Sequence, residues 1–376
     1  MSSVLLAGGG TAGHIEPALA VADALVAIDP RITITALGTA RGLETTLVPD
    51  RGYELRLIPA VPLPRKPSAD LLTLPTRLRS AIKATREIMS EREVDVVVGF
   101  GGYVALPAYL AARGKVPIVI HEANATAGLA NKIGARFAVA VAAAVEGTGL
   151  RGARVVGNPV RRSLSELDRP ALRAQAREFF GLDPAAPTLL VFGGSQGAQR
   201  INEAIAGAAA DLAALGIGVL HAYGRRNTAP DLGAAAGSRP PAYVAVPYLD
   251  RMDLAYSAAD LVLARSGAMT VAEIGAVGLP AVYVPLPHGN GEQRLNASAQ
   301  VASGAAIIIE DAELTSESLV SQVGPLVIDG IMRDGMSASA AAIAAQHADE
   351  MVARIVLAAV AAAARRQSPG DRPAGD

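Results

Sequence analysis

The sequence predicts an α/β protein of two doubly wound, Rossmann-like domains that face each other across a cleft. Short runs of β-branched residues alternate with longer Ala- and Leu-rich stretches, which is typical of parallel sheets covered by helices. This alternation restarts after residues 155–162. Each half opens with an apolar strand, a glycine cluster and a helix, read as VLLAGGGTAGH and LLVFGGSQGAQ. We therefore place the domain boundary near Arg161.

The individual elements follow from the same patterns. In the first half, strands are expected at residues 4–7, 32–37, 53–58, 94–98, 116–120 and 137–141, and helices at 17–27, 71–89, 106–112 and 128–136. In the second half, strands are expected at residues 188–192, 218–222, 243–246, 261–264, 281–284 and 305–309. A last, alanine-rich helix is expected at about 337–365, of which residues 343–366 pack back on the first domain, and residues 367–376 form a disordered tail.

Composition excludes several classes of function. A length of 376 residues suits two domains with cores of their own, and a net charge of -1 gives no support for nucleic-acid binding. The chain has no cysteine, so disulfides, thiolate nucleophiles and cysteine zinc sites are excluded. No Asp-x-Asp pair occurs, and we expect no metal and no cofactor. The longest apolar runs fall well short of the roughly 20 residues that span a bilayer, so we expect any membrane contact to be peripheral.

One glycine cluster follows the first strand of each half. Gly8, Gly10 and Gly13 match G-x-G-x-x-G, but a dinucleotide site also needs an acid about 20 residues on, and the second strand ends at Gly38 without one. The second cluster, residues 193–198, lacks that spacing, and neither cluster is a P-loop. Glycine loops let backbone N–H groups approach an anion. The alternative is a tight turn that binds nothing.

The segment at residues 264–280 contains the most informative candidate binding residues. A small-residue turn ends at Ala268 and a helix begins near Met269, where backbone N–H groups can hold a diphosphate without a metal. Glu273 lies about one turn inside, and its carboxylate could accept both hydroxyls of a ribose diol. The alternative is a surface glutamate that is stabilised by the helix dipole.

Seven blocks in order resemble the MurG family of peptidoglycan glycosyltransferases. They are GGGTAGH, VGFGGYVALP, HEANATAGLANK, VGNPVR, GGSQGA, RSGAMTVAEIGAVGLP and HGNGEQRLNA. The match spans residues 4–309, and the HEAN block and the order of the set are its specific parts. Departures are Ala12, where many members carry a second glycine, the Ile15-Glu16-Pro17 exit of the loop, and Ala123 and Thr126.

The resemblance implies a GT-B-type, metal-independent inverting transferase. It would move N-acetylglucosamine from UDP-GlcNAc to the MurNAc 4-hydroxyl of lipid I (undecaprenyl-pyrophosphoryl-MurNAc-pentapeptide), giving lipid II and UDP. Residues 1–161 would hold the acceptor and residues 162–342 the donor. The fold alone leaves other functions open. These are a UDP-sugar transferase acting on another lipid such as diacylglycerol, a non-enzymatic nucleotide-sugar binding protein, and a UDP-GlcNAc 2-epimerase.

The resemblance also implies roles for particular residues of the donor site. Glu273 would bind the ribose, the main chain near Leu249 the uracil, and Arg161 would neutralise donor charge. The diphosphate would contact Ser195 and the amides of Ala268, Met269 and Thr270, the sugar Gln293 and Asn296, and Thr11, Ala12, Gly13 and Asn124 would reach the donor from the first domain. A solvated arginine and a polar helix face are the alternatives for Arg161 and for the Gln293–Asn296 pair.

His14 is the candidate general base, because imidazole titrates near neutrality and the residue closes the first glycine cluster. A helix N-terminal residue or a phosphate contact is the alternative role. Glu122 is a competing candidate base, although a carboxylate beside His121 could be structural.

A membrane-facing segment is expected at residues 61–89, where leucines alternate with basic residues. Its candidate contacts are Leu71, Leu74, Arg77, Leu78, Arg79 and Lys83. The lipid diphosphate would lie at Gly10, Gly101 and Gly102. The expected partners are UDP-GlcNAc, lipid I, the anionic cytoplasmic face of the bacterial cell membrane and other cell-wall synthesis proteins. The alternative is an ordinary amphipathic helix with a solvated basic face.

Overall fold

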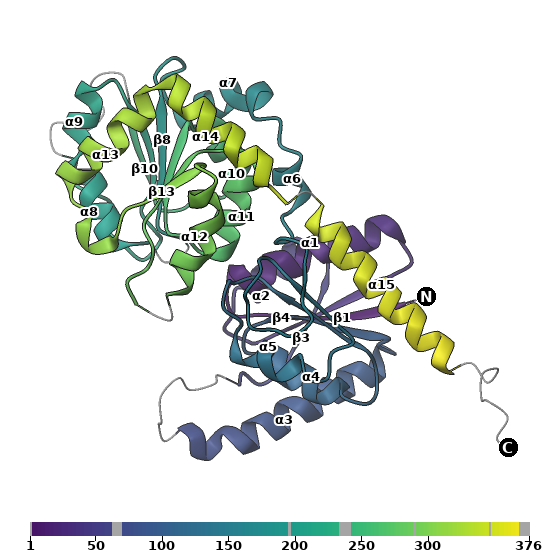
Figure 1. Cartoon of the computed structure of the whole chain (residues 1–376). Coiled ribbons are helices and arrows are strands. Elements are labelled where there is room, and N and C mark those ends of the chain that lie inside the picture. Colours follow the sequence, from purple (N-terminus) through teal and green to yellow (C-terminus); the bar gives the residue numbers. More distant parts are fainter. Residues whose placement is uncertain are drawn as a thin grey trace, which may run out of the picture. The chain divides into compact units, whose positions relative to one another are not determined.

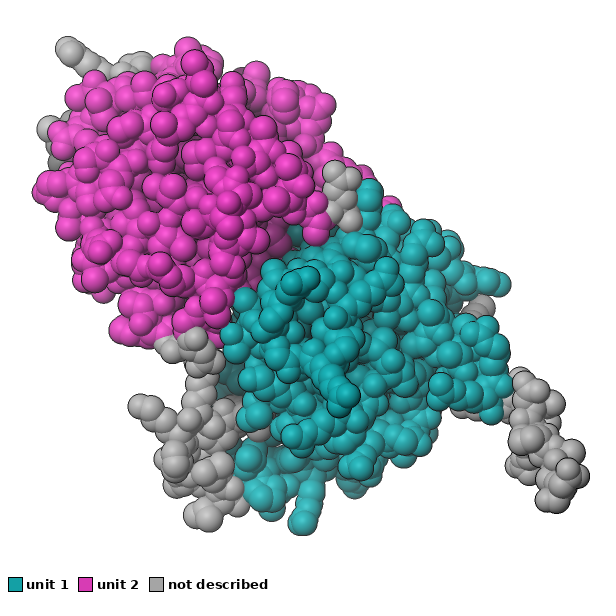
Figure 2. Space-filling model, in the orientation of Figure 1, with its two compact units in different colours: residues 1–161, 347–376 teal, residues 162–346 magenta. Residues whose placement is uncertain are grey.

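A computed structural model of the chain describes residues 2–61, 70–194, 197–232, 242–288, 291–345 and 347–367 (Figure 1). The chain forms two compact units, coloured separately in Figure 2. Unit 1 comprises Met1–Arg161 and His347–Asp376, and unit 2 comprises Arg162–Gln346. Each unit contains one wholly parallel sheet with helices between its strands. The predicted class, two doubly wound α/β domains, is confirmed.

Unit 1 is built on a seven-stranded sheet in the order β3-β2-β1-β4-β5-β6-β7. The order runs outward from the β1–β4 pair, and ligands of such sheets bind beyond the carboxyl ends of the strands at this reversal. Its strands are β1 (Ser3–Gly8), β2 (Thr33–Gly38), β3 (Glu54–Leu57), β4 (Val96–Gly101), β5 (Ile118–Glu122), β6 (Ala140–Ala143) and β7 (Arg154–Val155). Its helices are α1 (Ala12–Ile28), α2 (Glu44–Asp50), α3 (Asp70–Glu91), α4 (Ala105–Ala112), α5 (Leu129–Gly134) and α15 (Ala348–Gln367).

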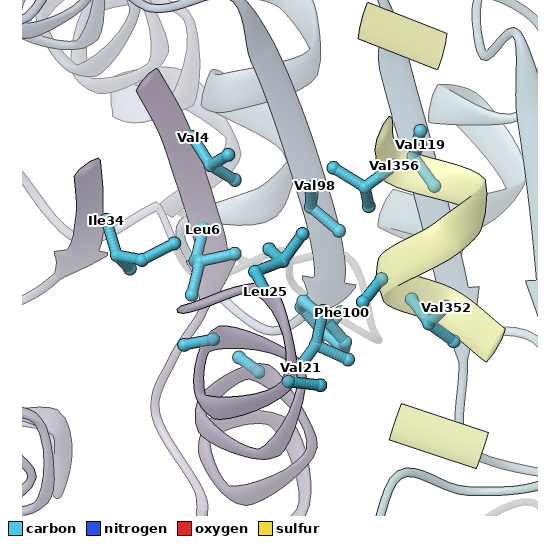
Figure 3. Close-up of a cluster of buried hydrophobic side chains, with 14 of the residues drawn as sticks. Val4, Leu6, Val21, Leu25, Ile34, Val98, Phe100, Val119, Val352 and Val356 are labelled. Atoms are coloured by element: carbon cyan, nitrogen blue, oxygen red, sulfur yellow. The ribbon is translucent and has the colours of Figure 1, made fainter. Parts of the chain in front are cut away.

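Both faces of this sheet are buried, because successive strand residues point to opposite faces. Val4 lies in the core formed with α1 and α15, whereas Leu5 lies in the core formed with α3, α4 and α5. Figure 3 shows the first core, where Val21 of α1 and Val352 and Val356 of α15 approach the strands. The C-terminal helix thus covers the sheet of unit 1.

Unit 2 repeats the plan with a six-stranded sheet in the order β10-β9-β8-β11-β12-β13, which reverses at β8–β11. Its strands are β8 (Thr188–Phe192), β9 (Gly218–Ala222), β10 (Tyr243–Val246), β11 (Leu261–Ala264), β12 (Ala281–Tyr283) and β13 (Ala306–Ile308). Its helices are α6 (Arg162–Ser165), α7 (Arg169–Phe180), α8 (Gln199–Gly207), α9 (Ala209–Ala214), α10 (Met252–Ala258), α11 (Ala268–Ala276), α12 (Glu292–Ala302), the 3-10 turn η2 (Asp311–Glu313), α13 (Ser316–Ile328) and α14 (Gly330–Ile343).

Helix α7 ties the amino ends of the central strands of unit 2 together. The Arg177 side chain is 1% exposed and donates to the Ala258 carbonyl and, at 2.9 Å, to the Asp260 carboxylate. Asp260 immediately precedes β11, and it also accepts the N–H of Thr188, the first residue of β8, at 2.7 Å. This network lies at the end of the sheet opposite to the carboxyl ends, so we assign it a structural role.

Two predicted elements of unit 1 begin three or more residues from the expected position. Helix α1 starts at Ala12 rather than residue 17, because the turn after β1 is short and Pro17 lies inside the helix. Strand β6 starts at Ala140 rather than residue 137, because the N–H of Phe137 still bonds to the Gly134 carbonyl in a helical turn. Strand β7 was not predicted, since both of its residues are exposed and show no apolar pattern.

The single helix predicted at 337–365 was wrong. Helix α14 ends at Ile343 and α15 begins at Ala348, and His347 between them has a φ of 58°. A right-handed helix needs a negative φ, so the chain must break there. Residues 368–376, most of the predicted tail, lie outside the described residues. Within the described ranges, no helix is both long enough and apolar enough to cross a bilayer.

Candidate functional site

The sheet reversal of unit 1 brings two glycine turns together. Gly101 ends β4 and Gly102 follows it, with φ values of 99° and 82°. A Cβ at Gly102 would lie 2.0 Å from the carbonyl oxygen of Gly9, in the turn after β1. Both conformation and space therefore require glycine at residue 102. Two of the three predicted acceptor residues thus lie at the position where doubly wound sheets bind ligands.

Gly10 needs a correction, because its N–H is already bonded within the protein. Glu44, at the start of α2, is 0% exposed, and its Oε2 accepts the Gly10 N–H at 2.9 Å. Its Oε1 accepts the backbone N–H and the hydroxyl of Thr39 at 2.7 and 3.1 Å. The buried carboxylate holds the turn in place, so this amide is not directed at a ligand. The acid that is missing from the end of β2 thus appears shortly after it, in a structural role.

His14 lies in the first turn of α1, half-buried, against the turn after β4. Its Nδ1 is 3.1 Å from the Thr11 hydroxyl, and a Cβ at Gly101 would lie 3.0 Å from its Nε2. Burial, the largest effect, lowers the pKa of His14 below 6.5, while the Glu122 charge and the Gly9 carbonyl partly oppose that change. The imidazole is therefore neutral near pH 7 and can accept a proton.

Glu122, the competing candidate base, is the centre of a buried hydrogen-bond network. The residue is 2% exposed, and its carboxylate accepts the N–H of Asn124 and of Gly128, each at 3.0 Å. The amide Nδ2 of Asn131 donates to it at 2.9 Å, and the Tyr109 hydroxyl in turn donates to Asn131 Oδ1 at 2.6 Å. With its oxygens engaged in this way, Glu122 is better suited to act as a fixed negative charge that favours protonated His14 than as the base itself.

The remaining first-domain residues of the predicted donor set lie in the same unit. Thr11 is exposed at the α1 N-terminus, and Ala12 and Gly13 are half-buried in its first turn. Arg161 lies 3.9 Å from the Glu16 carboxylate, so it is not the freely solvated arginine of the alternative interpretation. Arg161 Nε and Glu16 Oε2 are both buried without a hydrogen-bond partner among the described residues.

In unit 2 the turn after β8 packs against the turn after β9. Gly197 has a φ of 73°, and a Cβ there would lie 2.4 Å from the Tyr223 carbonyl oxygen. Asn202 of α8 and Asn227 both donate to that carbonyl, at 2.9 and 2.8 Å, and so support the glycine turn. Ser195 falls outside the described residues.

Helix α11 begins at Ala268, close to the predicted start at Met269. Its first turn contains no acidic residue, and the first N–H groups of a helix have no partner within the helix. Met269 and Thr270 lie in this turn. Glu273 is half-buried, and its Oε2 accepts the hydroxyl of the fully buried Tyr256 at 3.0 Å. Glu273 is therefore held in place by a tyrosine, whereas the alternative interpretation was a surface glutamate stabilised by the helix dipole.

The other predicted donor residues of unit 2 differ in what they contact. Gln293 accepts the Leu286 N–H at 2.9 Å through its Oε1. Asn296 is 8% exposed and its Nδ2 donates to the Ser266 carbonyl at 3.3 Å, so it supports the turn before α11 instead of forming an open polar face. Leu249 lies buried between β10 and α10, where its main chain remains a candidate contact for a base.

Helix α3 contains the predicted membrane contacts, and the role predicted for two of its leucines needs a correction. Leu74 and Leu78 are half-buried and pack against the core of unit 1, because this helix covers one face of the sheet. Arg77, Arg79 and Lys83 are exposed. The side chain of Leu71 lies outside the described residues. Among the described side chains of α3, the predicted contacts that could face a membrane are therefore basic residues rather than leucines.

Sequence reasoning missed Glu44 and Tyr256, whose partners are 34 and 17 residues away in the chain. A carboxylate soon after β2 was visible in the sequence, but its hydrogen bonds to the first glycine turn were not. The described residues contain no group of three or more His, Asp or Glu that could hold a metal ion.

Comparison with known proteins identifies the family of the chain. Residues 4–143 match the N-terminal domain of glycosyltransferase family 28, and residues 188–351 match its C-terminal domain. A protein of Rhodococcus erythropolis (strain PR4 / NBRC 100887) is 60% identical over 367 residues, covering 94% of each chain. One of Mycolicibacterium smegmatis (strain ATCC 700084 / mc(2)155) is 61% identical over 372 residues, covering 97% of this chain and 96% of its own.

Both relatives are named UDP-N-acetylglucosamine--N-acetylmuramyl-(pentapeptide) pyrophosphoryl-undecaprenol N-acetylglucosamine transferase. The crystal structure of Acinetobacter baumannii MurG is 30% identical with a TM-score of 0.75, covering 95% of this chain and 100% of that chain. Identity at this level over nearly the whole length confirms the resemblance seen in the sequence blocks. The chain therefore belongs to the MurG family of glycosyltransferases, within glycosyltransferase family 28.

Proposed function

We propose that this chain transfers N-acetylglucosamine from UDP-GlcNAc to the MurNAc 4-hydroxyl of lipid I, giving lipid II and UDP. The observation that carries the proposal is the 60% identity, over 94% of both chains, to a transferase named for this reaction. The site supports the proposal. Unit 1 places the neutral imidazole of His14 where the strand order of its sheet reverses, and unit 2 contains the N-terminus of α11 with Glu273 held by Tyr256.

The chemistry is a single displacement at the anomeric carbon. The bond from C1 to the β-phosphate oxygen breaks, the bond from the acceptor O4 to C1 forms on the opposite face, and the configuration inverts. His14 takes the proton of the attacking hydroxyl, and the Glu122 charge favours the imidazolium that results. UDP leaves with the electron pair of the broken bond.

The leaving diphosphate gathers negative charge, which the protein must offset without a metal ion in this proposal. Backbone N–H groups in the first turn of α11 and the dipole of that helix act on the diphosphate. Arg161 provides a full positive charge, which Glu16 holds in its position before the donor binds. Such preorganised dipoles and charges commonly make the greatest single contribution to catalysis of this kind.

An assay of acceptors tests the function directly. The protein is incubated with UDP-GlcNAc and lipid I, with diacylglycerol, or without acceptor, and UDP release and lipid mass are measured. We expect UDP release only with lipid I, a product heavier by one N-acetylglucosamine, and no loss of rate in EDTA. Turnover on diacylglycerol would favour the alternative acceptor, and donor conversion without acceptor would favour an epimerase. Loss of activity in EDTA that is restored by magnesium or manganese would contradict the metal-free mechanism.

We further propose a peripheral position on the anionic cytoplasmic face of the membrane, because the acceptor is anchored in lipid. Arg77, Arg79, Lys83 and Arg86 are exposed on α3, where Glu87 opposes them through a 3.8 Å pair with Lys83. A basic residue near an anionic surface contributes about 1 kcal/mol. The attachment is therefore electrostatic, with the half-buried leucines serving the domain core.

Reversing this charge should abolish binding to anionic vesicles. The variant Arg77→Glu, Arg79→Glu, Lys83→Glu is compared with wild type by co-sedimentation at moderate salt, with UDP affinity measured in parallel. The matched control is Arg354→Glu, Arg365→Glu, Arg366→Glu, the same change of charge at exposed sites on α15. We expect the α3 variant to stay in solution with normal UDP affinity and the control to sediment. Equal sedimentation of both variants would place the docking face elsewhere.

A further inference from the structure

Tyr256 contacts the glutamate of α11 from a fully buried position in α10. Its hydroxyl donates to Glu273 Oε2 at 3.0 Å, and its side chain is 0% exposed. Its carbonyl accepts the Nε of Arg169 at 3.1 Å. Its ring meets Phe192, the last residue of β8, edge-on with centroids 6.4 Å apart. Helix α7 and strand β8 thus fix the place from which this hydroxyl reaches the carboxylate.

We propose that Tyr256 is a positioning residue that presents Glu273 to the ribose of the donor, and so sets how well the protein distinguishes ribose from deoxyribose. This inference rests on the proposed donor site, in which Glu273 binds the ribose diol. A free glutamate side chain on a helix samples several rotamers, and ordering it costs up to about 2 kcal/mol. The Tyr256 hydrogen bond orders the carboxylate before the ligand arrives.

The proposed role requires the Glu273 carboxylate to bind both ribose hydroxyls. An ionised carboxylate has roughly four acceptor positions on its two oxygens. Tyr256 uses one of these positions, on Oε2, and in the proposed site the two ribose hydroxyls bind the same carboxylate. A ligand that lacks the 2′-hydroxyl would leave one of these ordered positions unfilled, and discrimination arises from that loss.

The backbone of α11 is held independently of Tyr256. The Nε2 of Gln300, on α12, donates to the Val271 carbonyl at 2.8 Å, and the Tyr283 hydroxyl donates to Gln300 Oε1 at 2.6 Å. Removing the Tyr256 hydroxyl should therefore release the Glu273 side chain without displacing the helix that carries it. A phenylalanine at residue 256 keeps the ring contact with Phe192.

The variant Tyr256→Phe tests the role. Calorimetry should show UDP binding weakened by about 10-fold, because the Glu273 side chain must then be ordered when the ligand binds, at a cost of up to about 2 kcal/mol. The ratio of affinities for UDP and 2′-deoxyuridine diphosphate should fall toward one. KM for the donor should rise while kcat changes little, because the ribose contact is the same in the ground and transition states. The matched control is Tyr243→Phe, whose hydroxyl bonds to His221 in the same unit and should leave the ratio unchanged.

The variant Glu273→Ala tests the ribose contact of Glu273 separately from the positioning role of Tyr256. In that background, adding Tyr256→Phe should cost no further UDP affinity, because the partner of the hydroxyl is gone. Unchanged UDP affinity in Glu273→Ala alone would mean that the proposed ribose contact is wrong. If Glu273→Ala weakens binding but Tyr256→Phe preserves the ratio of affinities, the positioning role is overturned, even where the melting temperature falls.

Discussion

Replacing His14 with alanine should lower kcat by about 10²- to 10⁴-fold while leaving the affinity for UDP nearly intact. The expected loss is that of a general base, since the imidazole would remove the proton of the attacking hydroxyl only as the new bond forms. Its place in the first turn of α1, beside Gly101, puts it at the sheet reversal of unit 1. Steady-state kinetics with lipid I and calorimetry with UDP measure the two quantities separately.

The pH profile gives a second measurement of the same role. Burial lowers the pKa of His14 below its ordinary 6.5, so the free enzyme holds the base neutral at and above that pH. Wild-type kcat/KM should therefore stay level near neutrality and fall as the pH drops through this lowered pKa. The alanine variant should lack this acid limb, because the group that becomes protonated there is missing.

Two variants serve as controls for His14. His347→Asn removes an imidazole from the connection between α14 and α15, and it should keep wild-type kinetics. Glu122→Gln removes the neighbouring charge and should lower the apparent pKa of the acid limb further, since Glu122 raises the pKa of His14. Wild-type turnover of the alanine variant from about pH 6 to pH 9 would exclude the base role. If the acid limb of the pH profile disappeared in Glu122→Gln but persisted in His14→Ala, the proton transfer would be assigned to Glu122.

Replacing Arg177 with methionine should destabilise unit 2 by about 3–5 kcal/mol, the usual cost of removing one partner of a buried ion pair. The guanidinium is 1% exposed and donates to the Asp183 and Pro184 carbonyls as well as to Ala258 and Asp260. Methionine would leave these acceptors buried without that donor. The chain has no tryptophan, so hydrogen exchange is the better measurement. Exchange protection in β8 and β11 should fall about 10²- to 10⁴-fold.

The matched control lies one helical turn earlier. Arg173 donates to the same Asp260 carboxylate at 2.6 Å, but its side chain is 36% exposed, so Arg173→Met should cost less than about 1 kcal/mol. Protection in β1 and β4 of unit 1 should not change in either variant. A small loss in Arg177→Met, equal to that of Arg173→Met, would contradict the structural role of the buried arginine.

The bounds of strands were predicted best in unit 2. The first four strands of unit 2 begin and end at the predicted residues. Three of them, β8, β9 and β11, are buried throughout, and such strands read as short apolar runs between turn residues. Strand β7 was missed, since its two residues are exposed and only pairing with β6 defines it. The break before α15 was missed because alanine-rich sequence favours helix throughout, and the positive φ of His347 has no sequence signal.

For the candidate site, the sequence indicated which residues lie there but not which residues form hydrogen bonds with them. The glycine turns, His14 and Glu273 lie at carboxyl ends of central strands, as strand–turn–helix patterns require. Their hydrogen bonds come from elsewhere in the chain. Glu44 bonds to Gly10, and Tyr256 bonds to Glu273, because the sheet order sets neighbours that sequence distance does not reveal.

The sequence by itself determined the two parallel α/β domains, the family and the glycine turns beside the central strands, because buried strands and glycine turns impose local patterns. Tertiary structure alone decided which polar groups are already occupied. In the folded chain the Gly10 amide donates to Glu44, and Leu74 and Leu78 pack against the core. The Tyr256 hydroxyl donates to Glu273. The physical reason is that a buried polar group needs a partner and a helix face needs a surface to cover. Both are supplied by segments that only the folded chain brings together.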